Sequence, residues 1–155
     1  MQNQFMQRAI ELSLENVRSG RGGPFAAVVV KDGEIIGEGT NQVTSSNDPS
    51  AHAEVMAIRA ACRRVSHFKL NGCDIYTSCE PCPMCLGVIY WAGLARLYYA
   101  NTKQDAADIG FDDSRIYREL ALPREQRAIP TQQMMRQEAL AAFRAWRDKP
   151  DKIPY

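Results

Sequence analysis

Long apolar runs are absent from this sequence of 155 residues, and neither sign of charge is in excess. The longest strongly apolar stretch runs from Phe25 to Val30, far short of the roughly 18–20 residues that a membrane span requires. The net charge is +1 without a basic block, which argues against avid binding of nucleic acid through its phosphates. The N-terminus lacks the charged and then apolar order of a secretory signal. We expect a cytoplasmic protein with neither a membrane nor a nucleic acid as partner.

The five cysteines are an odd number, and three of them crowd into residues 79–85. A disulfide framework usually has an even number of cysteines that are spread along the chain. Reduced thiols are the better interpretation, and their clustering indicates a metal site.

The hydrophobic pattern predicts an α/β fold with helices on both faces of a sheet. The first helix should place Phe5, Ala9, Leu12 and Leu14 on one apolar side. The expected elements are a helix at residues 5–19, strands at 25–31 and 34–41, a loop at 43–49, a helix at 51–65, a strand at 73–77, a helix at 82–91 and a strand at 94–100. Two successive strand-helix-strand units predict parallel pairing.

The length suits a single domain over residues 1–155, with one sizeable core. Beyond residue 100 the signal weakens to short helices at 105–109 and 114–120. An apolar stripe at helical spacing predicts a further helix at 137–147; it consists of Ala139, Ala142, Phe143 and Trp146. Residues 101–155 cannot build a second core alone.

His52-Ala53-Glu54, followed about 30 residues later by Pro81-Cys82-Pro83-Met84-Cys85, is the feature that carries chemistry. Zinc favours imidazole nitrogen and thiolate sulfur, and a catalytic zinc keeps three protein ligands and a water. His52, Cys82 and Cys85 would supply the three ligands. The two cysteines begin a predicted helix, where the helix dipole and the metal both lower the pKa of a thiol.

Glu54 is two residues beyond His52, and positions i and i+2 of a helix do not share a face. Both side chains can still serve one site if it lies beyond the first turn of the helix. We therefore expect two helix N-termini, at His52 and Cys82, to point at one metal. Zinc lowers the pKa of its bound water toward about 7, and Glu54 could carry the proton.

A closed structural zinc site is the alternative, because Cys79 could join His52, Cys82 and Cys85 in a shell of four ligands. Such a shell has no open position and no catalysis. It would leave Glu54 without a role, and a large α/β domain rarely needs a metal to hold it together.

The two motifs resemble the H-x-E and P-C-x-x-C signature of the zinc-dependent cytidine deaminase-like superfamily. The resemblance extends through Gly22-Gly23-Pro24-Phe25, Asn41 and Asn47-Asp48-Pro49. The segment Gly110-Phe111-Asp112-Asp113 makes the sequence similar to one subset of this superfamily, the small bacterial guanine deaminases. Adenosine deaminases that act on tRNA share the metal motifs, but they typically have Leu-Glu in place of Cys79-Glu80 and lack the Gly-Phe-Asp-Asp segment.

This resemblance implies a single CMP/dCMP-type deaminase domain, a three-layer α/β/α sandwich with a mixed five-stranded sheet. It implies Zn²⁺ on His52, Cys82 and Cys85, with Glu54 as proton shuttle. A zinc-activated hydroxide would attack C2 of guanine and give xanthine and ammonia, a step of purine catabolism. Guanosine, cytosine and the adenosine of a tRNA stay open as alternative substrates.

The resemblance also assigns roles outside the metal motifs. It places Asn41 against the purine, and it places Asp113 near the 2-amino group, where this residue protonates the leaving amine. It further implies a homodimer whose subunits exchange the C-terminal segment, residues 137–155, and close it over the site.

Five of these candidates have simpler explanations. Phe25 stacks on a base or packs in the core, and Asn41 reads a purine edge or caps a turn. Asp113 is an acid or part of a helix N-cap pair. Trp91 lines the pocket or belongs to the core, and Tyr155 is a lid or a frayed end.

Overall fold

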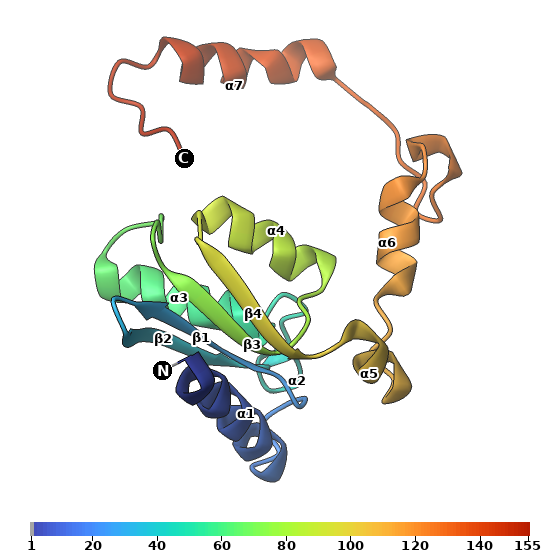
Figure 1. Cartoon of the computed structure of the whole chain (residues 1–155). Coiled ribbons are helices and arrows are strands. Elements are labelled where there is room, and N and C mark those ends of the chain that lie inside the picture. Colours follow the sequence, from blue (N-terminus) through green and yellow to red (C-terminus); the bar gives the residue numbers. More distant parts are fainter. Residues whose placement is uncertain (1) are drawn as a thin grey trace. The chain divides into compact units, whose positions relative to one another are not determined.

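The computed structural model describes residues 2–155 and divides the chain into two compact units, Met1–Asp113 and Ser114–Tyr155. The described residues form one sheet in the order β2-β1-β3-β4 (Figure 1). Strand β1 is antiparallel to β2 and β3, and β3 is parallel to β4. The elements of the first unit are α1 (Gln2–Arg18), β1 (Ala26–Lys31), β2 (Glu34–Thr40), α2 (Val43–Ser46), α3 (Ala53–Val65), β3 (Asp74–Cys79), α4 (Pro83–Ala92), β4 (Arg96–Asn101) and α5 (Lys103–Asp108).

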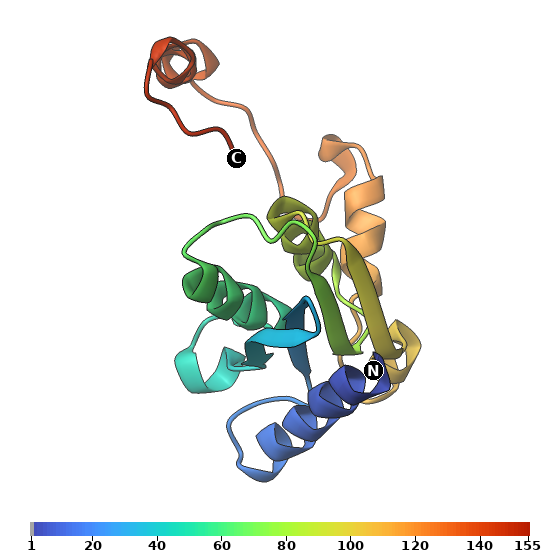
Figure 2. The same cartoon turned by 60° about the vertical axis from the view of Figure 1, so that its left-hand side comes forward.

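Strand β1 supplies both halves of the core because its successive side chains point to opposite faces of the sheet. Ala27 and Val29 pack with residues of α3 and α4, whereas Val28 packs with Phe5 and Leu12 of α1. Helix α1 therefore covers one face of the sheet, and α3 and α4 cover the other (Figure 2). This arrangement confirms the three-layer α/β/α fold.

Two details of the expected sheet are wrong. The described residues form four strands rather than five, because the capping box of Thr102 and Asp105 starts helix α5 directly after β4. The chain thus leaves the sheet, and β4 is an edge strand. Strands β2 and β3 run in the same direction but do not pair, since β1 lies between them; only the unit of β3, α4 and β4 gives a parallel pair.

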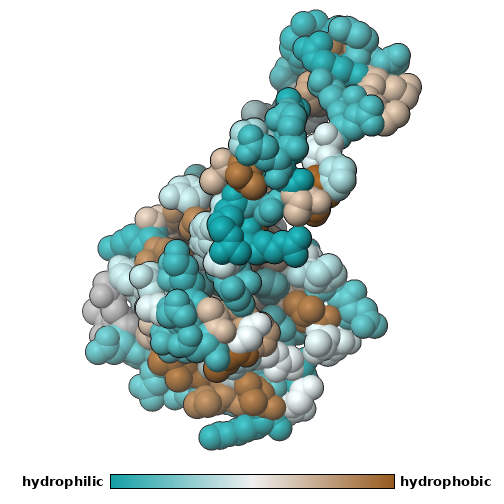
Figure 3. Space-filling view, turned by 90° about the vertical axis from the view of Figure 1, so that its right-hand side faces the viewer, coloured by the Kyte–Doolittle hydropathy of each residue, from teal (hydrophilic) through white to brown (hydrophobic). Residues whose placement is uncertain are grey.

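The expected apolar side of α1 is also corrected. Phe5, Ala9 and Leu12 are buried, but Leu14 is 48% exposed. Positions i and i+2 of a helix are separated by roughly 200° around its axis, so the side chains of Leu12 and Leu14 point in nearly opposite directions. Ile10, Leu14 and Val17 follow one another along the outer side, and brown apolar side chains gather near the lower edge of Figure 3, at the height of α1.

Close packing of β2 against α3 depends on two glycines. A Cβ atom on Gly37 would lie 2.5 Å from the backbone oxygen of Ala57, and one on Gly39 would lie 2.3 Å from the backbone oxygen of Ala53. Both neighbours are helix backbone, which cannot turn aside as a flexible side chain can. The glycines therefore set how near α3, and the residues at its start, lie to the sheet.

The second unit contains α6 (Ser114–Ala121), the 3₁₀ helix η1 (Arg124–Gln126) and α7 (Arg136–Asp148). The carboxylate of Glu119 accepts a hydrogen bond from the Ala128 backbone, which folds the chain after α6 back on it. None of residues 114–155 is buried, so this unit lacks a core of its own. Among residues 2–155, no helix combines the length and apolar character needed to cross a membrane.

Substitution of Gly39 by alanine should lower the free energy of unfolding by about 1–3 kcal/mol, because the methyl group has no room against α3. The matched control is Gly87→Ala in α4, where an added Cβ meets nothing within 4 Å. This control should raise stability by about 0.5–1 kcal/mol through helix propensity. Urea unfolding measures both, and equal effects would contradict the close contact.

Candidate metal centre

Helices α3 and α4 each begin at a predicted metal ligand. His52 is the N-cap of α3 and Cys82 is the N-cap of α4, both in extended backbone conformation. Pro83 follows Cys82 as the first helical residue, a position where the fixed φ of proline is favourable. Cys85 lies in the first turn of α4, so the sequence Cys-Pro-Met-Cys places two thiols at one helix start.

The loop before His52 is held by its own short polar side chains. The carboxylate of Asp48 accepts hydrogen bonds from the backbone N–H and the hydroxyl of Ser50, at 2.8 and 2.7 Å. The backbone N–H of Ala51 donates to the Asp48 carbonyl, and that of His52 donates to the Ser50 carbonyl. This turn directs the imidazole toward the start of α4.

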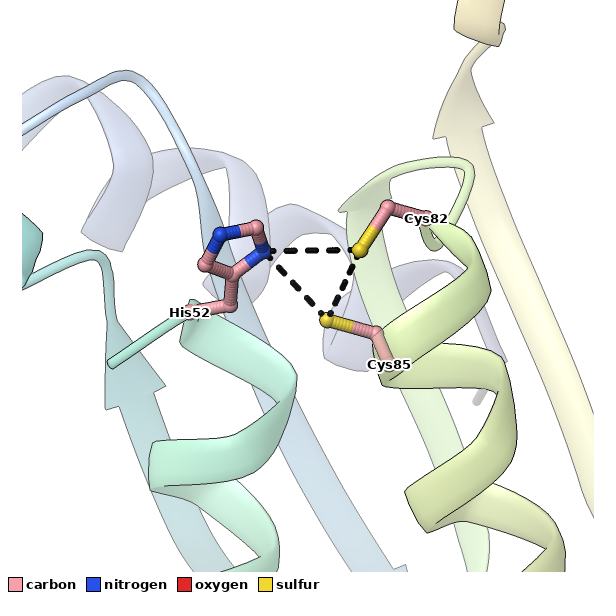
Figure 4. Close-up of side chains that lie close together, drawn as sticks. All are labelled: His52, Cys82 and Cys85. Atoms are coloured by element: carbon pink, nitrogen blue, oxygen red, sulfur yellow. Dashed lines mark hydrogen bonds between the residues drawn. The ribbon is translucent and has the colours of Figure 1, made fainter. Parts of the chain in front are cut away.

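Three ligand atoms form a nearly equilateral triangle (Figure 4). His52 Nδ1 lies 3.6 Å from Cys82 Sγ and 3.5 Å from Cys85 Sγ, and the two sulfurs are 3.6 Å apart. Tetrahedral zinc with ordinary bond lengths requires about 3.6 Å between nitrogen and sulfur and about 3.8 Å between sulfurs. The triangle therefore matches one face of a zinc tetrahedron, and the donors are those that zinc prefers.

The protons of this group are unequally held. A hydrogen bond from Cys85, together with His52, lowers the pKa of Cys82 to about 4 despite burial. The same hydrogen bond to Cys82 and burial raise the pKa of Cys85, and the bond to Cys82 raises the pKa of His52. One thiolate thus forms readily, while a metal must displace the proton that Cys85 retains.

Glu54 lies beside this group in the first turn of α3 and is 8% exposed. Its Oε2 atom is 3.3 Å from Cys85 Sγ. Burial raises the pKa of the Glu54 carboxyl. A carboxyl group whose pKa is raised holds a proton more readily than an ordinary carboxyl, which suits a group that takes up a proton and passes it on.

Cys79 lies outside the ligand group, which among the described residues consists of His52, Cys82 and Cys85. Its thiol instead donates to the backbone oxygen of Thr102 at 3.6 Å, and burial raises its pKa to about 11. A thiol that keeps its proton and points toward β4 is a poor fourth ligand. The geometry therefore favours the open three-ligand site over the closed structural one.

Comparison with known proteins agrees with this geometry. A sequence family described as the cytidine and deoxycytidylate deaminase zinc-binding region matches residues 1–101. The chain belongs to this deaminase family. It is 55% identical to the guanine deaminase of Bacillus subtilis over 97% of both chains. The X-ray structure of the guanine deaminase from that organism has 54% identity, covers 99% of this chain and 98% of its own, and has a TM-score of 0.96.

The tRNA-specific adenosine deaminase of Aquifex aeolicus is 50% identical, but over only 40% of this chain and 41% of that protein. The family membership predicted from the two motifs is thereby confirmed, as is the expectation of a zinc site. The similarity is thus nearly full-length for the Bacillus subtilis guanine deaminase and partial for the Aquifex aeolicus enzyme.

Three further candidates of this deaminase chain lie in the first unit. Burial, followed by the negative charge of Cys82, raises the pKa of the Asp113 carboxyl. Phe25 packs against the core and meets Phe111 edge to face, with ring centroids 4.9 Å apart. Asn41 Oδ1 accepts a hydrogen bond from the Val43 backbone at 3.3 Å. The simpler roles of Phe25 and Asn41 are thus present, and base contact stays a prediction.

Two candidates are not brought to the metal group within this unit. Trp91 is 65% exposed in the last turn of α4, nine residues beyond Cys82 and so about 13 Å away along the helix axis. Tyr155 belongs to the second unit and is 76% exposed. Their predicted substrate contacts have no support from the geometry of the first unit.

Sequence reasoning missed Glu80, which joins the ends of β3 and β4. Its backbone N–H donates to the Asn101 carbonyl at 2.8 Å, and its carboxylate accepts from the Lys103 backbone at 3.0 Å. These bonds fix where α5 starts, and hence the path of the chain toward Asp113. The signal in the sequence is weak: Glu80 is adjacent to the Pro-Cys motif, but no spacing rule links it to residue 103.

Replacement of Cys79 by alanine should leave one equivalent of zinc per chain, because its sulfur is not a ligand. Replacement of Cys82 by alanine should abolish stoichiometric zinc, since two protein ligands bind far more weakly than three. Metal analysis of the purified proteins measures both. Loss of zinc from the Cys79 variant would instead indicate the closed four-ligand site.

Proposed function

We propose that this protein is a zinc-dependent guanine deaminase that hydrolyses guanine to xanthine and ammonia, a reaction of purine catabolism. The observation that carries the proposal is the three-ligand triangle with a buried glutamate beside it, in a chain similar over nearly its whole length to the Bacillus subtilis guanine deaminase. The same site chemistry would suit other small bases and nucleosides. Guanosine and cytosine are therefore the alternative substrates to exclude.

The extent of similarity supports guanine over an adenosine in tRNA. The match to the Aquifex aeolicus enzyme covers 40% of this chain, whereas the match to the guanine deaminase also includes the Phe111–Asp113 region and the second unit. A net charge of +1 also gives little general attraction to RNA phosphates.

His52, Cys82 and Cys85 would hold a zinc ion, which would act as a Lewis acid and lower the pKa of a water molecule toward about 7. Glu54 takes the proton of the attacking water on its carboxylate and passes it to the purine. The water oxygen would form a C–O bond at C2, the C–N bond to the amino group would break, and the proton of the new hydroxyl group at C2 would replace the one that Asp113 gives to the leaving amine. Guanine and water are thereby converted to xanthine and ammonia, with all atoms accounted for.

The residues around Asn41 would form the purine side of the site. Asp113 gives a proton to the leaving amine, a role that suits a carboxyl whose pKa is raised. The amide of Asn41 contacts the purine edge, and the ring of Phe25, held by Phe111, stacks on the base. Substrate binding therefore depends on three segments that are distant in the sequence.

We further propose a homodimer in which residues 137–155 are exchanged between subunits. Phe143 is 74% exposed and Trp146 is 45% exposed on α7, and no residue of the second unit is buried. Burial of such large apolar side chains by a partner subunit would stabilise a dimer. Docked over the partner's site, the segment with Tyr155 would exclude water from the reaction.

A cytoplasmic location suits the reduced thiols that the metal group needs.

The variant Glu54→Gln should keep zinc and the fold but lose at least about a thousandfold in kcat for guanine, since the amide cannot carry the proton. Ammonia release and the ultraviolet spectrum of xanthine follow the reaction, and metal analysis with circular dichroism checks zinc and fold.

The wild-type protein serves as the control in the same assay on guanine, guanosine, adenine and cytosine. Guanine should be the preferred substrate. Turnover of cytosine or adenine without guanine would refute the proposed substrate, and wild-type rates in the Glu54 variant would refute the proton carrier.

Subunit exchange predicts that two inactive chains restore activity in each other. One carries Glu54→Gln, and the other lacks residues 137–155. In an exchanged dimer, the intact tail of the first covers the intact Glu54 site of the second. Random pairing should give roughly a quarter of wild-type activity after co-expression. A mixed dimer without activity would show that each tail serves its own subunit.

A further inference from the structure

Asn16 is a polar side chain that α1 carries into the protein interior, where it is 0% exposed. Its Nδ2 atom donates two hydrogen bonds of 2.9 Å, to the backbone oxygens of Gly23 and Asn41. Its Oδ1 atom has no hydrogen-bond partner among the described residues. The amide thus acts only as a donor, and both of its acceptors are backbone.

These two acceptors belong to the segments proposed to contact the purine. Gly23 lies two residues before Phe25, and the Phe25 backbone N–H donates to the same Gly23 oxygen. The Asn41 backbone N–H donates in turn to the Phe25 carbonyl at 3.0 Å. One amide therefore closes a ring of hydrogen bonds that runs through Gly23, Phe25 and Asn41.

The two segments approach each other so closely that no side chain fits between them. A Cβ atom on Gly22 would lie 2.1 Å from the Asn41 oxygen and 3.1 Å from the Asn16 Nδ2. Buried carbonyl oxygens without a donor are unfavourable and move toward water or another donor. Without the Asn16 amide, the Asn41 oxygen would lose its donor and the Gly23 oxygen would keep the Phe25 N–H alone, so the two segments would separate.

The ring is also linked to the metal ligands. The backbone N–H of Gln42, next to Asn41, donates to the carbonyl of Ala51 at 2.9 Å, and Ala51 precedes His52. A displacement of Asn41 would reach His52 through this one backbone bond, whereas the Asp48–Ser50 turn and the starts of α3 and α4 hold the ligand triangle independently. Binding of the base is thus more sensitive to Asn16 than is the metal.

We infer that Asn16 is a positioning residue for the purine side of the site, and that it holds Phe25 and Asn41 in the relative placement that binds the base. The inference rests on the proposed function, because the purine is what these two residues contact. Asn16 itself touches no reacting atom.

The variant Asn16→Leu tests this, since leucine has a similar size but donates no hydrogen bond. KM for guanine should rise roughly tenfold, with kcat changed less than about threefold and zinc content unchanged. The matched control is Ser13→Ala on the same helix: Ser13 is 8% exposed and its hydroxyl donates to the Ile10 carbonyl at 2.7 Å, within the helix itself. This control should leave KM unchanged. If Asn16→Leu does not fold, Asn16→Ala and Gly22→Ala disturb the same contact and should raise KM.

A double-mutant cycle with Asn41→Ala separates positioning from general stability. When the Asn41 side chain is already absent, Asn16→Leu should reduce kcat/KM much less than it does in the wild type. Full additivity of the two effects on kcat/KM, or a lower melting temperature of Asn16→Leu with unchanged KM, would overturn this inference but not the proposed function. A wild-type protein that leaves guanine unchanged would refute the proposed function and this inference with it.

Discussion

The meeting of two helix N-termini at one group of three ligand atoms is the constraint on which the rest of this structure depends. His52 and Cys82 each occupy the last position before a helix, so their side chains can lie close only if α3 and α4 begin side by side on one face of the sheet. The packing of both helices on β1 and β3 meets this condition. The partial positive charge at both helix starts also favours the thiolates that a cation would bind.

Burial of Glu54 is the second consequence of the same arrangement. A charged carboxylate away from water is unfavourable for the fold, and its pKa rises accordingly. The same burial brings the carboxyl to 3.3 Å from Cys85 Sγ and so beside the atoms that hold the metal. Part of the stability of the fold is thus given up to place a carboxyl group at this point, beside the three candidate ligands.

The helix starts and the group of candidate ligands could be predicted from the sequence, because the signals for them lie within a few neighbouring residues. The two motifs predicted which three side chains come together and where the two helices start, because capping and metal chemistry restrict residue types within a few positions. The sheet order could not be read in this way, since β1 inserts between β2 and β3 through long-range pairing. Asn16 and Glu80 were missed for the same reason. Their partners lie up to 25 residues away, and a single amide or carboxylate in a sequence does not indicate which backbone group it will meet.

The absence of side chains at Gly37 and Gly39 affects more than the edge of the sheet. Because β2 touches the backbone of α3 at these points, anything that pushes the helix outward shifts His52 and Glu54 together, while Cys82 and Cys85 remain on α4. The candidate ligands thus lie on two different helices, and the contact between β2 and α3 sets the distance between these helices. Substitutions at positions 37 and 39 would accordingly impair metal binding and turnover in chains that still fold. These two positions should therefore vary less among related proteins than their distance from the metal centre implies.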